Sequence, residues 1–205
     1  MYNPDDVIVL AGGASVASYD LRHIEKRGYL IGVNDSALFT KCDVAFTMDR
    51  LWLEGRQLLL KVLNPPDIWF RYGTPKNFNP PQHWMAFRHS ETDPTLMSSE
   101  PGFLNGSNSG TCALNLAYQR AQKRVFLLGF DMQHGPEGEK HWYPDYPWGT
   151  GGGSKKGTLR DWAEEFDSIE KQFTKRHIEV FNVNHRSLIT AFKTITYDTF
   201  RKMTV

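Results

Sequence analysis

The sequence contains only two cysteines among its 205 residues, Cys42 and Cys112, and neither belongs to a CxxC pair. Two isolated thiols exclude a disulfide scaffold and a zinc knuckle. No apolar run approaches the roughly 20 residues that span a bilayer. The first residues are acidic rather than basic, which argues against a secretory signal. We therefore expect a cytoplasmic protein with reduced thiols and no membrane span.

Excess charge is also absent. The chain has 24 Lys and Arg against 23 Asp and Glu, a net charge of +1, so its bulk charge does not attract nucleic-acid backbones or acidic membranes. Its length is that of one domain, and with 40% hydrophobic residues it can bury a substantial core. We expect residues 1–205 to form a single domain.

Short apolar runs that end in turn residues indicate parallel strands buried on both faces. The runs cover residues 7–11, 29–33, 44–48, 125–128 and 178–181. Helical periodicity alternates with them and is expected from Ser15 to Gly28, after Asp49, after Ser109 and over 159–173. This alternation predicts an α/β fold, with a mostly parallel Rossmann-like sheet, helices on both faces and irregular insertions at one edge.

Two stretches lack any period. Residues 67–106 are interrupted by prolines and are expected to form a Pro-rich insertion over the sheet, in which only 68–70 and 84–87 are strand candidates. Residues 129–157 are rich in aromatic side chains and contain a Gly-Gly-Gly run near their end. A connection this long is typical of a binding loop or lid. We expect this second stretch to close over a ligand as an aromatic lid loop.

The turn after the first strand is a candidate nucleotide site. Gly12 and Gly13 leave the backbone open at the end of a buried strand, and Ser15 follows at the start of the predicted helix. Amides in such a turn can face an anion such as a phosphate. Because the segment has neither GxGxxG nor a Walker lysine, a plain strand-to-helix turn is an equally good interpretation.

Further polar residues follow the next strands, at the edge where open α/β sheets bind their ligands. Asn34 can recognise a ribose or a base, and Asp35 beside it is a further nucleotide-binding candidate. Asp49 can hold a ribose hydroxyl, an amine or a hydrated Mg²⁺, and Asp131 belongs with it. For Asp35 and Asp49, capping of a helix is an equally good interpretation.

Two later segments complete the candidate site. Ser109, Gly110 and Thr111 open a predicted helix and offer a second anion or ribose contact, although Ser109 can equally be only its N-cap. Residues 138–149 bring together an imidazole and four aromatic rings. His141 can move a proton, because its unperturbed pKa is near 6.5, while Trp142 or Tyr143 stacks on the ligand. For the two tryptophans of this loop, an aromatic cluster that pins the loop is the preferred interpretation.

Taken in order, these segments resemble the bacterial lipooligosaccharide sialyltransferases. That family has a strand ending in A-G-x-G-P-S, an Asn after the second strand, a T-S-G that opens a helix and a strand ending in G-x-D. Similar segments lie here at 11–15, 34, 108–110 and 129–131, and the family's C-terminal N-S-L-x-x-x-F is similar to 184–192. The resemblance covers most of the chain and implies a nucleotide-sugar transferase.

The resemblance does not extend to the family's general base. Where that family places a His before Ser-Lys, this chain has Gly153, so His141 would have to substitute from upstream. The layout also resembles the MptE-like 6-hydroxymethylpterin diphosphokinase domain, which has an acid after the third strand, as Asp49 is here. Small phage proteins share the G-x-D-M, H-W and D-x-P elements found at 129–132, 141–142 and 145–147.

Three functions follow as hypotheses. The first is transfer of a sugar from a nucleotide donor, with His141, Asp131 and Asp49 as catalytic candidates. Its nucleotide-binding candidates are Gly12, Gly13, Ser15, Asn34, Asp35, Ser109, Gly110, Thr111, Trp142 and Tyr143. The second is a pyrophosphokinase that uses ATP with Mg²⁺ held by the two acids. The third is a non-catalytic nucleotide-binding or phage assembly protein.

The sequence leaves the partners of these reactions open. The acceptor is a glycan, a small molecule or a modified nucleic acid, and the base and sugar of the donor are not specified. No cofactor is required by the first hypothesis, and Mg²⁺ enters only with the second. The oligomeric state is likewise not indicated.

Overall fold

The computed structural model describes residues 3–71, 80, 84–89, 93–148 and 158–204. These residues form one eight-stranded sheet in the order β5-β4-β3-β2-β1-β6-β7-β8, and every pairing is parallel. The strands are β1 (Asn3–Leu10), β2 (Gly28–Val33), β3 (Val44–Thr47), β4 (Asp67–Arg71), β5 (Trp84–Phe87), β6 (Arg124–Leu128), β7 (Glu179–Asn182) and β8 (Lys193–Thr194). The predicted α/β fold is confirmed, and the sheet is wholly parallel.

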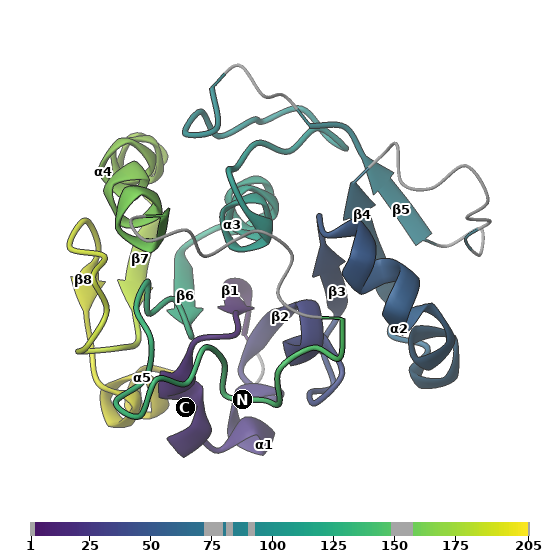
Figure 1. Ribbon diagram of the computed structural model, residues 1–205. Coiled ribbons are helices and arrows are strands. Elements are labelled where there is room, and N and C mark those ends of the chain that lie inside the picture. Colours follow the sequence, from purple (N-terminus) through teal and green to yellow (C-terminus); the bar gives the residue numbers. More distant parts are fainter. Residues whose placement is uncertain (1–2, 72–79, 81–83, 90–92, 149–157, 205) are drawn as a thin grey trace.

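Helices cover both faces of this sheet (Figure 1). One face carries α3 (Ser109–Arg120) and α4 (Thr158–Lys175). The other carries η1 (Ala14–Ser18), α1 (Leu21–Ile24), η2 (Asn34–Ala37), α2 (Arg50–Leu63) and α5 (Tyr197–Met203). None of the helices in the described residues is long and apolar enough to cross a membrane.

The central strand β1 shows why the buried strands appear in the sequence as continuous apolar runs. Val7 and Val9 belong to the core cluster under α3 and α4, while Ile8 and Leu10 belong to the cluster under α2 and α5. All four side chains are fully buried. A strand covered on both faces has no solvent side, so its sequence shows no alternation with polar residues.

The helix predicted from Ser15 to Gly28 is wrong in extent and in its cap. The structure has the short 3-10 helix η1, an extended Tyr19, and then α1, whose N-cap is Asp20. Ser15 does not cap a helix. Its amide and hydroxyl both donate to the carboxylate of Asp131, which lies 116 residues later in the chain. A tertiary contact therefore replaces the local one.

The two strand candidates of the Pro-rich stretch, 68–70 and 84–87, are confirmed, but they belong to the sheet rather than to an insertion over it. Residues 67–71 and 84–87 are strands β4 and β5, which extend the sheet at its edge. Their buried positions, such as Ile68 and Phe87, anchor them to the core. Residues 93–106 do run outside the sheet, where Asn115 of α3 accepts hydrogen bonds from the amides of Ser98 and Asn105.

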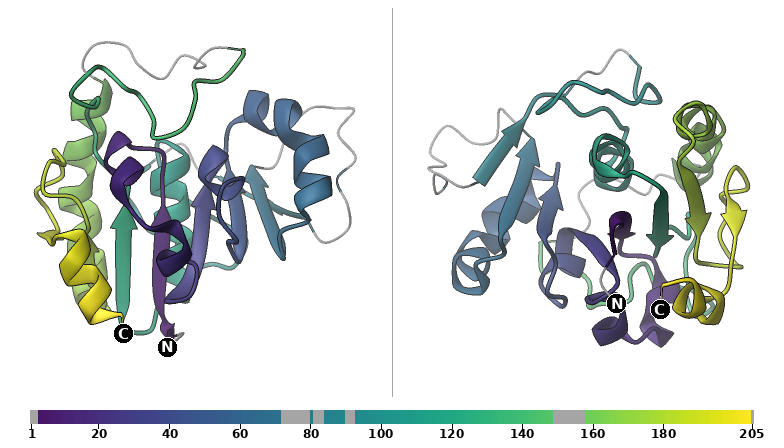
Figure 2. Two further views of the ribbon diagram at one scale, coloured as in Figure 1. Left: turned by 90° about the horizontal axis from the view of Figure 1, so that it is seen from below. Right: turned by 180° about the vertical axis from the view of Figure 1, so that it is seen from behind.

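The order of the strands reverses beside β1. The chain steps outward from β1 to β5, returns through α3 and then adds β6, β7 and β8 on the other side of β1. The carboxyl ends of all strands lie at one edge. The loop that follows β6 passes over this edge, opposite the two termini (Figure 2, left). In open parallel sheets, ligands bind outside this edge at the point of reversal.

Candidate functional site

A cavity of about 480 Å³ lies at this reversal, and we call it the central cavity. Its lining comes from the turns after β1, β2, β3 and β6, the N-terminus of α3, the loop that follows β6, and Leu159 and Trp162 of α4. Segments from most of the chain therefore meet in one place. This is the location that the strand order predicts for a nucleotide.

The two glycines after β1 are required by close packing. A Cβ atom at Gly12 would lie 2.6 Å from Tyr143 Oη, and one at Gly13 would lie 2.5 Å from Asp131 Cγ. The amide of Gly13 donates to Gly129 O at 2.9 Å and that of Ser15 donates to Asp131 Oδ2 at 2.9 Å. These two amides are already satisfied within the protein. Neither amide is left for a ligand anion, since that of Ser15 already faces the carboxylate of Asp131, and Ser15 does not line the central cavity.

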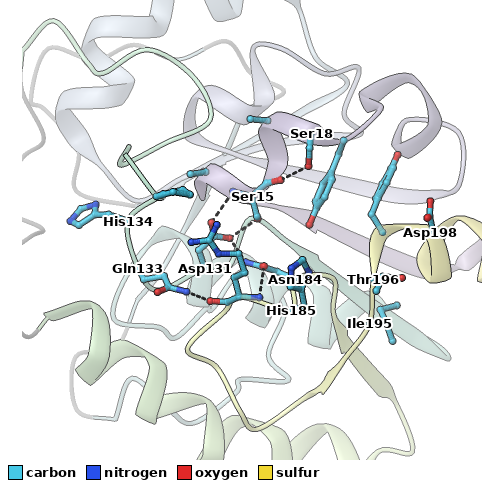
Figure 3. A pocket seen from close by; sticks show the side chains of 17 residues that line it. Ser15, Ser18, Asp131, Gln133, His134, Asn184, His185, Ile195, Thr196 and Asp198 are labelled. Carbon is cyan, nitrogen blue, oxygen red and sulfur yellow. Dashed lines mark hydrogen bonds between the residues drawn. The ribbon is translucent and has the colours of Figure 1, made fainter. Parts of the chain in front are cut away.

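Asp131 connects three loops at the carboxyl edge (Figure 3). Its Oδ1 accepts hydrogen bonds from Ser15 Oγ and from Asn184 Nδ2, both at 2.6 Å. The carboxylate is 7% exposed and has three donors in all, so its charge is well satisfied. Sequence reasoning missed Asn184. The available signal was a polar residue two positions after the end of a buried strand.

A second cavity of about 510 Å³ lies next to the central one, and Figure 3 shows it. Asp131, Gln133 and His134 line both cavities. On its far side, the rings of Tyr19 and Tyr197 stack at 4.4 Å. The sequence did not indicate this cavity, because its lining comes from η1, the loop after β6, the end of β7 and the start of α5.

Asn34 faces the central cavity from the end of β2. Its backbone is left-handed, with a φ of 52°, a conformation that costs free energy for a residue other than glycine. Its Oδ1 accepts a hydrogen bond from Thr47 Oγ1 at 2.8 Å. Within the described residues its Nδ2 has no partner, so this amide group is available to a ligand.

Asp35 does not line the central cavity, and its assignment to nucleotide binding stays a prediction. The carboxylate is 2% exposed and accepts from Trp52 Nε1 at 2.6 Å. Arg56 forms a bidentate pair with it, through Nε at 3.0 Å and Nη2 at 2.7 Å. Both partners come from α2, so Asp35 fixes that helix to the end of β2. Helix capping, the alternative for Asp35, is not what it does.

Asp49 is the N-cap of α2, as the alternative interpretation held. Its Oδ1 accepts from the amides of Leu51 at 2.8 Å and Trp52 at 3.3 Å, while the residue still lines the central cavity. The described residues contain no group of three His, Cys, Asp or Glu that would hold a metal ion. Asp49 and Asp131 are both engaged by protein donors, so this pair does not fit a Mg²⁺ site.

The N-terminus of α3 forms one wall. Its N-cap is Asn108 rather than Ser109, and a capping box joins Asn108 to Thr111. Thr111 is therefore buried and does not line the cavity, contrary to prediction. Gly110 does line it, as does Ser109, whose Oγ accepts from the amide of Met48 at 3.1 Å. Sequence reasoning confused the cap with its neighbour because both are good capping residues.

Glu165 of α4 lies behind this wall, and it was not among the site residues predicted from the sequence. Ser107 Oγ donates to its carboxylate. Burial raises the pKa of Glu165 and outweighs the opposing effect of that hydrogen bond. A glutamate in the middle of an amphipathic helix gives no sign of such a contact, which joins α4 to the start of α3.

His141 lies at the opposite wall. Its ring stacks on Tyr143, with centroids 5.0 Å apart and planes 7° apart. Nδ1 is 3.4 Å from Asp145 Oδ1, whose side chain is 61% exposed. Burial lowers the pKa of His141, and the interaction with Asp145 opposes that shift only in part. This shift favours the neutral imidazole, which is the form that can accept a proton.

The tyrosines beside it keep their protons. The hydroxyls of Tyr143 and Tyr146 are 3.0 Å apart, and both residues line the cavity. Burial raises the pKa of Tyr146 to about 12 and that of Tyr143 well above its ordinary value. One hydroxyl donates to the other, which leaves a second proton for a ligand. Tyr146 was not among the predicted site residues, although it stands in the predicted loop.

Trp142 does not line the central cavity. Its Nε1 is directed at Ser36 Oγ and Ala11 O, at 3.2 and 3.3 Å, and its ring packs edge-on against Phe39. Trp148 packs on Tyr146 with centroids 5.4 Å apart. The two tryptophans belong to an aromatic cluster, as the preferred interpretation held. The assignment of Trp142 to nucleotide binding stays a prediction.

The described part of the predicted lid loop, residues 129–148, packs against the carboxyl edge. The amide of Trp142 donates to Gly12 O at 3.1 Å, and the rings that follow rest on α2. The Gly-Gly-Gly run and Gly153 lie outside the described residues. Closure of the loop over a ligand stays a prediction.

Most of the predicted site is brought together by the fold. The central cavity is lined by Gly12, Gly13, Asn34, Asp49, Ser109, Gly110, Asp131, His141 and Tyr143. Four predicted residues lie outside it, Ser15, Asp35, Thr111 and Trp142. This lining combines the two engaged carboxylates with neutral hydrogen-bonding groups, the imidazoles of His134 and His141, the ammonium group of Lys140 and two tyrosine hydroxyls. Together they surround a space large enough for a nucleotide.

Comparison with known proteins shows where this fold recurs. The sialyltransferase CstII from Campylobacter jejuni, in complex with the substrate analogue CMP-3FNeuAc, superposes with a TM-score of 0.52 over 93% of this chain and 86% of its own, at 12% identity. A complex of CST-II with a trisaccharide acceptor and CMP gives 0.53 over the same shares, at 14% identity. No family model and no curated protein matches the sequence. The chain has a sialyltransferase-like fold.

Proposed function

We propose that this chain transfers a glycosyl group from a nucleotide sugar to a hydroxyl acceptor. The observation that carries the proposal is the placement of His141 and two tyrosine hydroxyls against one cavity at the strand reversal. The fold supports it, because the solved sialyltransferase that shares the fold was captured with CMP and with a CMP-sugar analogue. The likeness to pterin diphosphokinases and to phage proteins stays a prediction.

In this proposal the donor binds across the glycine turn and the N-terminus of α3. Asn34 offers its Nδ2 and Gly110 offers an approach without a side chain. Asp131 positions the loops around the donor rather than reacting, because its oxygens already accept three hydrogen bonds. Asp49 borders the site as a helix cap.

In the proposed transfer step, His141 and the tyrosine pair have different roles. The acceptor oxygen attacks the anomeric carbon while the bond from that carbon to the phosphate oxygen breaks, and the electron pair leaves with the nucleotide. His141, whose neutral form is favoured because burial lowers its pKa, takes the acceptor proton. The paired hydroxyls of Tyr143 and Tyr146 donate their one remaining proton in a hydrogen bond to the negative charge that develops on the phosphate. No step requires a metal ion.

A panel of donors tests the reaction class. The protein is incubated with CMP-, UDP- and GDP-sugars and with ATP, each with and without Mg²⁺, and the released nucleotide is quantified. We expect turnover of one nucleotide sugar without a metal requirement. Turnover of ATP that depends strictly on Mg²⁺ would contradict the proposal in favour of a pyrophosphokinase. Nucleotide binding without any turnover would contradict it in favour of a binding protein.

The His141→Ala variant tests the base. Loss of a general base should lower kcat by about 100- to 10,000-fold while donor affinity, measured by calorimetry, stays within about twofold. His185→Ala is the control, since this exposed histidine follows β7 and does not line the central cavity. A kcat within a few-fold of the parent for His141→Ala would remove His141 from the mechanism.

A further inference from the structure

Four rings of the loop after β6 pack in series, as two stacked pairs joined by a contact tilted by 39°, and the series ends at His141. Trp148 lies on Tyr146 with centroids 5.4 Å apart and planes 3° apart. Tyr146 meets Tyr143 at 6.1 Å, and their hydroxyls are hydrogen-bonded. Tyr143 then stacks on His141 at 5.0 Å. Because each ring rests on the next, the position of Trp148 is transmitted to the imidazole.

The far end of this series rests on α2. A Cβ atom at Gly55 would lie 2.6 Å from Trp148 Cη2, so the indole occupies the space that any side chain there would need. The guanidinium carbon of Arg56 lies 5.0 Å from the centre of the Trp148 ring. Arg56 is itself held by its bidentate pair with the buried carboxylate of Asp35. The surface of α2 on which Trp148 packs is therefore rigid.

His141 has little else to hold it. Within the described part of the chain its one polar side-chain partner is Asp145, which lies 3.4 Å away with a side chain that is 61% exposed, a geometry that contributes little. We propose that Gly55 and Arg56 of α2 are positioning residues that set the orientation of His141 through the series of rings. The inference rests on the proposed function only where it treats His141 as the base.

The Gly55→Ala variant tests the series of rings without changing charge. Alanine normally favours a helix over glycine, but here its methyl group must displace Trp148. We expect the imidazole to become more exposed, so that the pKa of His141, measured by NMR titration, rises toward its ordinary value. Arg56→Lys should act in the same direction, because lysine keeps the charge and loses the planar, bidentate contact.

The charged and titratable groups around His141 must be accounted for in this titration. Asp145 and Lys140 come from its own loop, Asp35 from η2, and Tyr143 and Tyr146 from the series of rings. Neither variant removes a charge from this set. Matched controls lie on the same helix, Leu58→Ala at a side chain that is 73% exposed and Arg50→Lys at an exposed ion pair. Both should leave the His141 titration unchanged.

The outcomes separate the inference from the proposed function. A raised pKa of His141 in Gly55→Ala and Arg56→Lys, with unchanged controls, supports the positioning role even if the donor panel shows no turnover. An unchanged pKa in a folded Gly55→Ala protein overturns the role even if the donor panel succeeds. Should Gly55→Ala fail to fold, Arg56→Lys decides by the same readout.

Discussion

The carboxylate of Asp131 occupies a position that a bound anion holds in many nucleotide-binding turns. It accepts from the amide of Ser15 and reaches that turn from the end of β6. The protein thereby supplies its own anion, and a ligand phosphate has to bind elsewhere in the central cavity. Within the described residues, the tyrosine pair, through its one remaining proton, and the side-chain amide of Asn34 are neutral donors that line this cavity.

Replacing this one charge should be costly for stability. In Asp131→Asn an amide NH₂ would face a donor, since Ser15 and Asn184 supply three donors to the two oxygens. A buried donor left without an acceptor costs about 1–3 kcal/mol. We expect a loss of about 2 kcal/mol in the free energy of unfolding, measured in urea. Asp167→Asn, at an exposed position of α4, should be neutral, and equal stability of the two variants would contradict the account.

Among the elements, α2 begins at a residue that both caps the helix and lines the central cavity. Substitutions of this cap residue can distinguish the two roles. Asp49 is its N-cap, and Asn is as good an N-cap as Asp. Asp49→Ala should therefore lose about 1 kcal/mol of stability, while Asp49→Asn should keep it. Thermal unfolding of both variants gives this comparison. If Asp49→Asn keeps its stability but loses turnover in the donor panel, the charge of Asp49 acts in the reaction and the cap is not its whole role.

The elements also show what can be predicted from sequence. The apolar runs at β1, β2, β3, β6 and β7 were placed within a few residues, because strands buried on both faces are apolar throughout. Strands β4 and β5 were treated as parts of an insertion, since prolines surround them and each is short. The helix after Ser15 was overestimated because nothing local reveals that Asp131 binds Ser15.

The candidate site shows a similar contrast between residue positions, which were predictable, and side-chain directions, which were not. Residues at strand ends, such as Asn34 and Asp131, were placed correctly at the carboxyl edge because topology alone fixes that position. Side-chain direction was not predictable. Asp35 directly follows Asn34 yet faces α2, and Trp142 directly follows His141 yet faces Ser36. Neighbours in a turn diverge according to what packs beside them.

For the whole molecule, the two cysteines report on the integrity of both core layers. Cys112 belongs to the cluster under α3 and Cys42 to the cluster under α2, and burial raises the pKa of each to about 12. Only the thiolate reacts. We expect a thiol reagent at pH 8 to titrate no cysteine in the native protein and both after unfolding in guanidinium chloride. Reaction of one thiol before unfolding would show that its layer opens locally.

The position of β1 at the centre of the sheet has a consequence for synthesis on the ribosome. Asp6 of β1 pairs with Arg124 of β6, 118 residues further on. At roughly 5–20 residues per second, one edge of this apolar strand waits about 6 to 24 s for its neighbour. An unpaired strand edge is a template for aggregation. The yield of native protein should therefore depend on the speed of translation and on chaperones that shield residues 7–10 during that interval.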